Sequence, residues 1–97
     1  MSHAIIGLCT LDLHIPGVAS LKEKRGYLKS ILNRLHNKFN VSAAEVGNHD
    51  KWQLATIAFA VVSGSGAHAD QVLAKAINFI EASYPDVIIT GQDIEII

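Results

Sequence analysis

Residues 13–38 read LHIPGVASLKEKRGYLKSILNRLHNK, and this stretch contains the end of a strand, a turn and a helix in succession. Pro16-Gly17 ends the apolar segment before it, because this pair of residues favours a turn. Ser20 and Glu23 form a capping box, in which the serine oxygen accepts from the Glu23 amide and the glutamate accepts from the Ser20 amide. A helix is therefore predicted to begin directly after Ser20.

The helix predicted after Ser20 is amphipathic. Its apolar stripe consists of Leu21, Leu28, Ile31, Leu32, Leu35 and Phe39. Gly26 lies within the helix, where glycine costs about 0.5–1 kcal/mol relative to alanine, and the sequence offers no reason for it.

The remaining elements follow from hydrophobic periodicity and turn residues. Residues 4–15 nearly alternate, which predicts a half-buried strand with its polar positions outward. Further strands are predicted over residues 41–46, 52–62 and 87–96, the last with a bulge or bend near Gly91. A second helix is predicted over residues 67–83, with Ser65 available as its N-cap and Pro85 after its end.

The predicted order of elements is β-α-β-β-α-β. With right-handed crossovers around a central hairpin, this order gives a ferredoxin-like α+β sandwich, a four-stranded antiparallel sheet with two helices on one face. A length of 97 residues suits a single domain over residues 1–97. The other face of the sheet is then open, and it is expected to carry Leu8, Thr10, Asp12, Trp52, Leu54 and Thr56.

Composition narrows the class of protein. About half of the residues are apolar, which excludes a disordered chain. The apolar runs fall short of the ~20 residues of a membrane span, and the N-terminus does not resemble a signal peptide. The single cysteine, Cys9, lies on the core-facing side of the first predicted strand. It is expected to be a buried thiol in a cytoplasmic protein.

Positive charge is concentrated in the first helix. Residues 1–40 carry a net charge of +4 and residues 41–97 a net charge of −5. A basic helix that begins at a tight turn is a surface suited to phosphate, although a merely solvated helix face has the same composition. The predicted nucleic-acid contacts are Lys22, Lys24, Arg25, Lys29, Arg34 and Lys38. Helical spacing places Lys22, Arg25 and Lys29, together with His36, on one flank of the helix, and the other three cations on the opposite flank.

The sequence has no catalytic signature. A nucleophile elbow, a phosphate loop and a dinucleotide fingerprint are all missing. The histidines lie far apart and have no metal-ligand spacing. We therefore expect no enzyme activity, no catalytic residues, no metal and no cofactor.

Two segments resemble a known family. Residues 13–17 (LHIPG) with residues 20–25 (SLKEKR) resemble the signature of the YlxP-like bacterial proteins, a family of unknown function, and residues 39–53 are similar to its middle segment. The resemblance implies a ferredoxin-like fold. It also implies genes beside those of translation initiation factor two and ribosome-binding factor A, and by association a role in ribosome maturation or RNA binding.

Three functions follow as hypotheses. The first is an RNA- or ribosome-associated accessory protein that binds phosphate through the basic helix. The second is a homodimeric structural or ligand-sensing module that uses the open sheet face, with Leu8, Trp52 and Leu54 at the interface. The third is an acylphosphatase-like hydrolase, which is less favoured because the loop after the first strand holds no arginine before Arg25. No membrane partner is expected.

Overall fold

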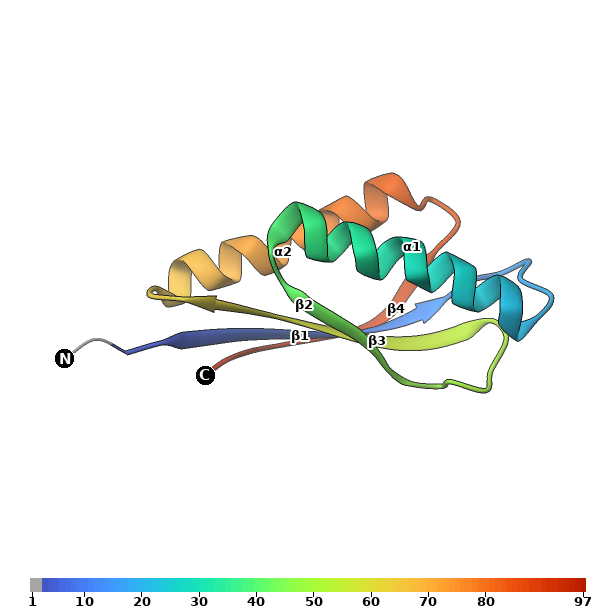
Figure 1. The fold of residues 1–97 in the computed structure, drawn as a ribbon, viewed down its shortest axis with the longest axis horizontal. Coiled ribbons are helices and arrows are strands. Elements are labelled where there is room, and N and C mark those ends of the chain that lie inside the picture. The colour runs from blue at the N-terminus through green and yellow to red at the C-terminus, as the bar shows by residue number, and fades with distance from the viewer. Residues whose placement is uncertain (1–2) are drawn as a thin grey trace.

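A computed structural model describes residues 3–97, and its elements alternate in the predicted order (Figure 1). They are β1 (Ile5–His14), α1 (Leu21–Phe39), β2 (Ser42–Gly47), β3 (Leu54–Ser63), α2 (Gly66–Ser83) and β4 (Ile88–Ile96). The bounds differ from the predicted ones by one or two residues. The largest consequence concerns Trp52, which precedes β3 instead of beginning it.

The four strands form one antiparallel sheet in the order β2-β3-β1-β4. Both helices pack on the same face of this sheet, and none of the described residues forms a helix on the opposite face (Figure 1). The predicted α+β sandwich with a ferredoxin-like arrangement is confirmed. Neither helix is both long and apolar enough to cross a lipid bilayer.

The register of the central strands separates the two faces of the sheet. Cys9 lies opposite Phe59, and Leu11 opposite Ile57, and all four side chains are buried beneath the helices. Their neighbours along the strands, such as Thr10, point to the open face, as period-two alternation requires. The core is completed by the predicted stripe of α2: Leu73, Ala76, Ile77, Ile80 and Tyr84.

The predicted irregularity in β4 is confirmed. The register of β1 with β4 shifts between Asp12, which lies opposite Gly91, and Leu13, which lies opposite Ile89. A Cβ atom at residue 91 would lie 2.7 Å from Asp12 Oδ2. Glycine therefore allows the Asp12 carboxylate to lie against the β4 backbone.

Serine caps both helices, as the sequence predicts. Ser20 accepts a hydrogen bond from the Glu23 amide over 3.1 Å, and Ser65 accepts from the His68 amide over 3.3 Å. The second hydrogen bond of the predicted capping box, from the Ser20 amide to the Glu23 carboxylate, is wrong in its donor. Glu23 Oε2 accepts from the amide of Ala19, over 2.7 Å, instead of that of Ser20. The carboxylate thus anchors the turn one residue further before the helix.

Gly26 gives a direct test of helix energetics. A Cβ atom at this position would have no neighbour within 4 Å, and the residue has no positive φ. Gly26→Ala should therefore raise the free energy of unfolding by about 0.5–1 kcal/mol, measured by urea denaturation. Gly17→Ala is the control, since its φ of +85° should make alanine destabilising there. A Gly26→Ala variant less stable than the parent would contradict this account.

Candidate nucleic-acid interface

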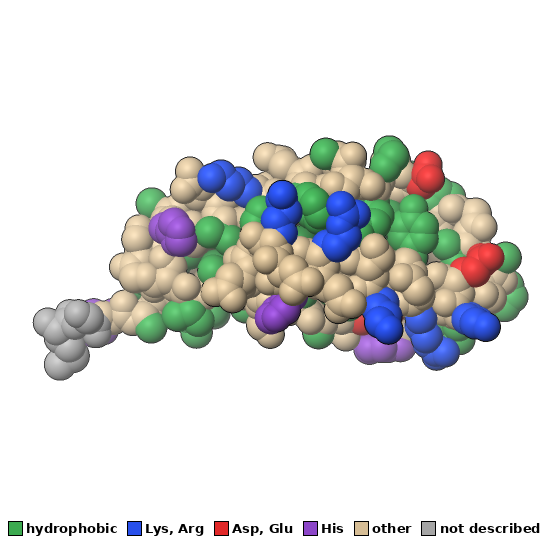
Figure 2. All heavy atoms as spheres, turned by 45° about the horizontal axis from the view of Figure 1, so that its top comes forward, with side chains coloured by type: hydrophobic (Ala, Val, Ile, Leu, Met, Phe, Trp, Pro, Cys, Tyr) green, Lys and Arg blue, Asp and Glu red, His purple; other side chains and the backbone are tan. Residues whose placement is uncertain are grey.

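The first helix presents its positive charges in two groups. Its buried side is a stripe of Lys24, Leu28, Ile31 and Leu35, with spacings of 4, 3 and 4 residues. The five remaining cations of the helix are exposed, and they lie on either side of that stripe: Lys22, Arg25, Lys29, Arg34 and Lys38. Figure 2 shows the Lys and Arg side chains of this face in separate groups, one of them against hydrophobic side chains.

One flank of α1 consists of Lys22, Arg25 and Lys29. Their spacings of three and four residues place them on one side of the helix, as predicted. Among residues 3–97, the only ion pair within 4.0 Å joins Lys24 to Glu45, so none of these three side chains is neutralised by a carboxylate. Their charge is therefore available to a ligand.

The other flank consists of Arg34 and Lys38, and it lies against aromatic rings of α2 and its C-cap. The Arg34 guanidinium carbon lies 4.9 Å from the ring centre of Phe79 and 5.2 Å from that of Tyr84. Arg34 also donates a hydrogen bond of 3.0 Å to the Tyr84 hydroxyl. These contacts hold the guanidinium in place while the residue stays exposed.

Lys38 extends the same arrangement towards the end of the helix. Its ammonium lies 5.4 Å from the ring centre of Phe79 and 5.9 Å from that of Phe39. A shallow hollow of about 290 Å³ lies beside the two cations and is lined by Arg34, Asn37, Lys38 and Phe79. The aromatic part of this surface is absent from the sequence-based prediction, because the contact depends on how α1 packs beside α2.

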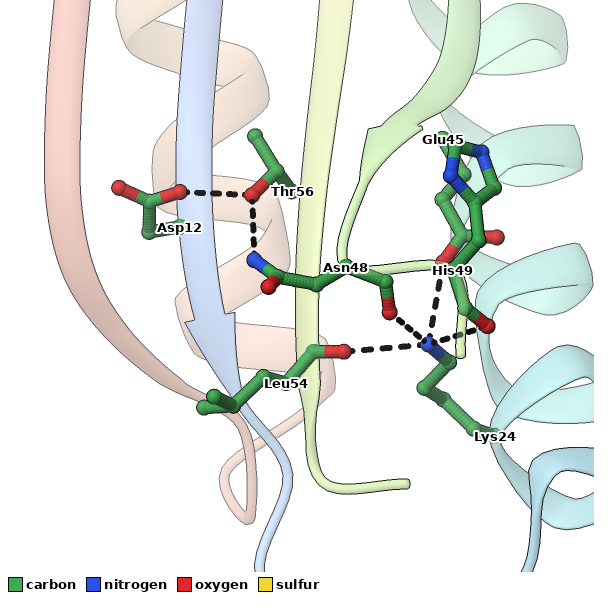
Figure 3. Close-up of polar contacts among 7 residues, drawn as sticks. All are labelled: Asp12, Lys24, Glu45, Asn48, His49, Leu54 and Thr56. Carbon is green, nitrogen blue, oxygen red and sulfur yellow. Dashed lines mark hydrogen bonds and ion pairs between the residues drawn. The ribbon is translucent and has the colours of Figure 1, made fainter. Parts of the chain in front are cut away.

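Lys24 does not lie on the surface, and its prediction as a phosphate contact is wrong. Its side chain is 0% exposed. The ammonium donates to three backbone carbonyls, those of Asn48 (2.7 Å), Leu54 (3.1 Å) and His49 (3.3 Å), and lies 3.2 Å from Glu45 Oε2 (Figure 3). Enclosed by these oxygens, the Lys24 ammonium cannot reach a phosphate.

The Lys24 ammonium stabilises the loop between β2 and β3. Asn48 has a backbone φ of 60°, and its side-chain amide (Nδ2) donates to Thr56 Oγ1 over 3.0 Å. Thr56 in turn donates to Asp12 Oδ1 over 2.8 Å (Figure 3). A chain of polar contacts therefore runs from the first turn of α1 to the open sheet face, and it fixes the loop relative to both.

The open sheet face carries the residues predicted for a partner interface, with one difference. Leu8 is half-buried in β1, and Leu54, at the start of β3, is 40% exposed. Trp52 is 56% exposed, but it lies in the loop before β3 and outside the sheet. Leu8 and alanines 44, 58 and 60 line a hollow of about 160 Å³. The face is thus apolar at its centre, and among residues 3–97 it has no row of aromatic side chains.

The described residues offer no metal centre. Within residues 3–97, no three His, Cys, Asp or Glu side chains gather closely enough to hold an ion. Burial, reinforced by the negative charge of Asp93, raises the pKa of the Cys9 thiol to about 11. Cys9 is therefore a protonated core side chain at neutral pH.

The sequence places this fold and its basic helix in a known family. The chain belongs to the family described as "Protein of unknown function (DUF503)", which matches residues 6–93. It is also similar to the "Uncharacterized protein YlxP" of Bacillus subtilis (strain 168), with 41% identity over 83 residues, covering 86% of this chain and 89% of that protein. The resemblance to the YlxP-like proteins is confirmed.

The enclosure of Lys24 predicts a large effect on stability. Lys24→Met should lower the free energy of unfolding by about 3–5 kcal/mol, because Glu45 and three carbonyls are left without their cation in a buried place. Lys29→Met, at an exposed position, should change it by less than about 0.5 kcal/mol. Chemical denaturation measures both, and equal effects would contradict the arrangement.

The state of Cys9 predicts slow alkylation. At pH 8 the native thiol should react with iodoacetamide at least about 100-fold more slowly than the protein unfolded in urea, because burial keeps it protonated and covered. Because the pKa of Cys9 is raised from 9.0 to about 11 on folding, the contribution of the protonated thiol to the free energy of unfolding is fully present below about pH 9 and is lost as the pH rises towards 11. Equal alkylation rates in the two states would show that Cys9 is accessible.

Proposed function

We propose that this protein is an RNA-binding accessory protein, which contacts the sugar-phosphate backbone through the exposed cations of α1. The contacts are Lys22, Arg25, Lys29, Arg34 and Lys38. Lys24 is excluded because it is buried. The protein acts by binding and carries out no reaction of its own.

The observation that supports this function is the set of five exposed cations on one helix without a carboxylate partner among residues 3–97. The positive charges of these five side chains repel one another, and a bound polyanion neutralises that repulsion. Lys22 and Arg25 also lie in the first turns, where positive charge opposes the helix dipole by about 0.3–1 kcal/mol each. An arrangement with this energetic disadvantage favours a bound anion over simple solvation.

RNA is favoured over other polyanions by the family association. The association with translation that the YlxP resemblance implies points to ribosomal RNA. Within the part of the chain that the structure describes, the open sheet face has no row of aromatic side chains on which bases could stack, so recognition by backbone and shape on the helix side is favoured. Arg34, already held by Tyr84 and Phe79, would lose little side-chain entropy on binding.

Binding measured across a salt series tests this proposal. The affinity of the parent for ribosomal RNA fragments, measured by fluorescence anisotropy, should fall log-linearly with salt. Neutralising one flank in the variant Lys22→Gln/Arg25→Gln/Lys29→Gln should reduce the slope of that line by about 3, or about 1 for each phosphate that no longer meets a cation.

The control for the flank variant is Lys75→Gln, which removes a positive charge from α2 and should leave the slope unchanged. Lack of affinity at low salt, or a triple variant that binds like the parent, would refute RNA binding through α1.

Self-association through the open sheet face is a second candidate function. Ile6 (41% exposed) lies opposite Val62 (71% exposed) on this face, so two large aliphatic side chains are adjacent and uncovered. Sedimentation at micromolar concentration distinguishes the cases. A dimer that Val62→Lys dissociates would support this candidate, and a monomeric parent would exclude it.

A further inference from the structure

The outward side of α1 carries a strip of neutral residues, and Lys22, two positions before the buried Lys24, borders that strip at its N-terminal end. Gly26, Ser30, Asn33 and Asn37 are all exposed, and each follows a buried residue of the stripe by two positions. Two residues correspond to a rotation of about 200°, so these four positions form a crest opposite the core. Glycine, serine and asparagine give this crest a low profile and hydrogen-bonding groups.

The crest separates the two cationic flanks. Arg25 and Lys29 each follow a buried residue by one position, which places them on one side of the crest, with Lys22 one turn before. Arg34 and Lys38 each follow a buried residue by three positions, which places them on the other side, towards the rings of Phe79 and Tyr84. The helix thus has positive charge on both sides of a neutral ridge.

We propose that α1 docks in the minor groove of an RNA duplex, with its crest towards the groove floor and its flanks on the phosphates of the two strands. The inference rests on the proposed function and specifies the form of RNA. The minor groove of A-form RNA is wide and shallow and displays 2′-hydroxyls. A helix with its side chains is about 10–12 Å across, so its two flanks can face different strands of the duplex.

Charge distribution favours a duplex over a single strand. A single strand presents one line of phosphates and can engage one flank, whereas two strands engage both. Glu23 is the only acidic residue of α1, and its carboxylate is occupied by the Ala19 amide before the helix. The asparagine amides of the crest can donate to and accept from 2′-hydroxyls. The Ser30 hydroxyl is already hydrogen-bonded to that of Tyr84 over 2.8 Å, and only its remaining hydrogen-bonding capacity is open to a 2′-hydroxyl.

Gly26 fits the same geometry. A Cβ atom there would meet nothing within 4 Å in the free protein, so internal packing does not require glycine. Glycine permits the close approach of a ligand to the helix backbone, at a cost in helix stability. In the docked helix, this residue is where the backbone comes nearest to the groove floor.

Substitution of this glycine separates binding from folding. Gly26→Leu should leave the protein at least as stable as the parent, because leucine is the better helix former and the space is open. It should weaken binding to an RNA duplex of about 16 base pairs at least tenfold, because the side chain holds the helix out of the groove. Ala74→Leu, on the exposed side of α2, is the matched control and should bind like the parent.

Three probes of one sequence complete the test: the RNA duplex, the DNA duplex and the single RNA strand. The RNA duplex should bind at least tenfold more tightly than either other probe. Both flank variants, Lys22→Gln/Arg25→Gln/Lys29→Gln and Arg34→Gln/Lys38→Gln, should reduce its salt slope, by about 3 and about 2.

Failure of the groove proposal is distinguishable from failure of RNA binding. Equal affinity for single-stranded RNA or for the DNA duplex would overturn docking in an RNA minor groove, as would duplex binding that Gly26→Leu leaves intact. In those cases RNA binding through α1 would stand as long as the flank variants weaken it. No affinity for any RNA probe at low salt would overturn both proposals.

Discussion

The position of α1 depends on one buried ammonium group. Lys24 is fully enclosed, and its ammonium meets three backbone carbonyls and the carboxylate of Glu45. A buried cation is tolerated only when its oxygen partners are all in place, so the first turn of α1, strand β2 and the loop before β3 are fixed together. With that side of the helix held against the sheet, the remaining cations face solvent. The same contact that removes Lys24 from the surface therefore orients the charges that remain there.

Local patterns predict most of the fold. Alternation in β1 and the apolar stripe of α2 identify buried residues correctly, because period and burial are directly linked. The burial of Lys24 escapes prediction because a lysine within a basic run is ordinarily exposed. Its spacing of 4 and 7 residues before Leu28 and Ile31 nevertheless places it on the buried stripe, and this signal is present in the sequence. Glu45 lies on the same strand face as Val41 and Ala43, so its position in the sequence indicates an acidic partner for Lys24 on the buried side.

The candidate site is less predictable than the fold. The flank of Lys22, Arg25 and Lys29 follows from helical spacing alone, and the structure places these residues as expected. The contacts of Arg34 with Phe79 and Tyr84 join residues about 45 to 50 positions apart, and they require the packing of two helices that no local pattern specifies. The neutral crest becomes recognisable only when the buried side of α1 is known. Together these features describe a helix whose buried side is locked and whose outer side is suited to a polyanion.

The most direct test is to map the binding surface by the backbone amide NMR shifts of the protein titrated with an RNA duplex. Docking through α1 predicts that the largest changes follow its crest and flanks, at Gly26, Arg25, Lys29, Asn33 and Asn37, while the open sheet face around Leu8 and Leu54 stays unchanged. Changes concentrated on the sheet face, or a spectrum that RNA leaves unaltered, would contradict it.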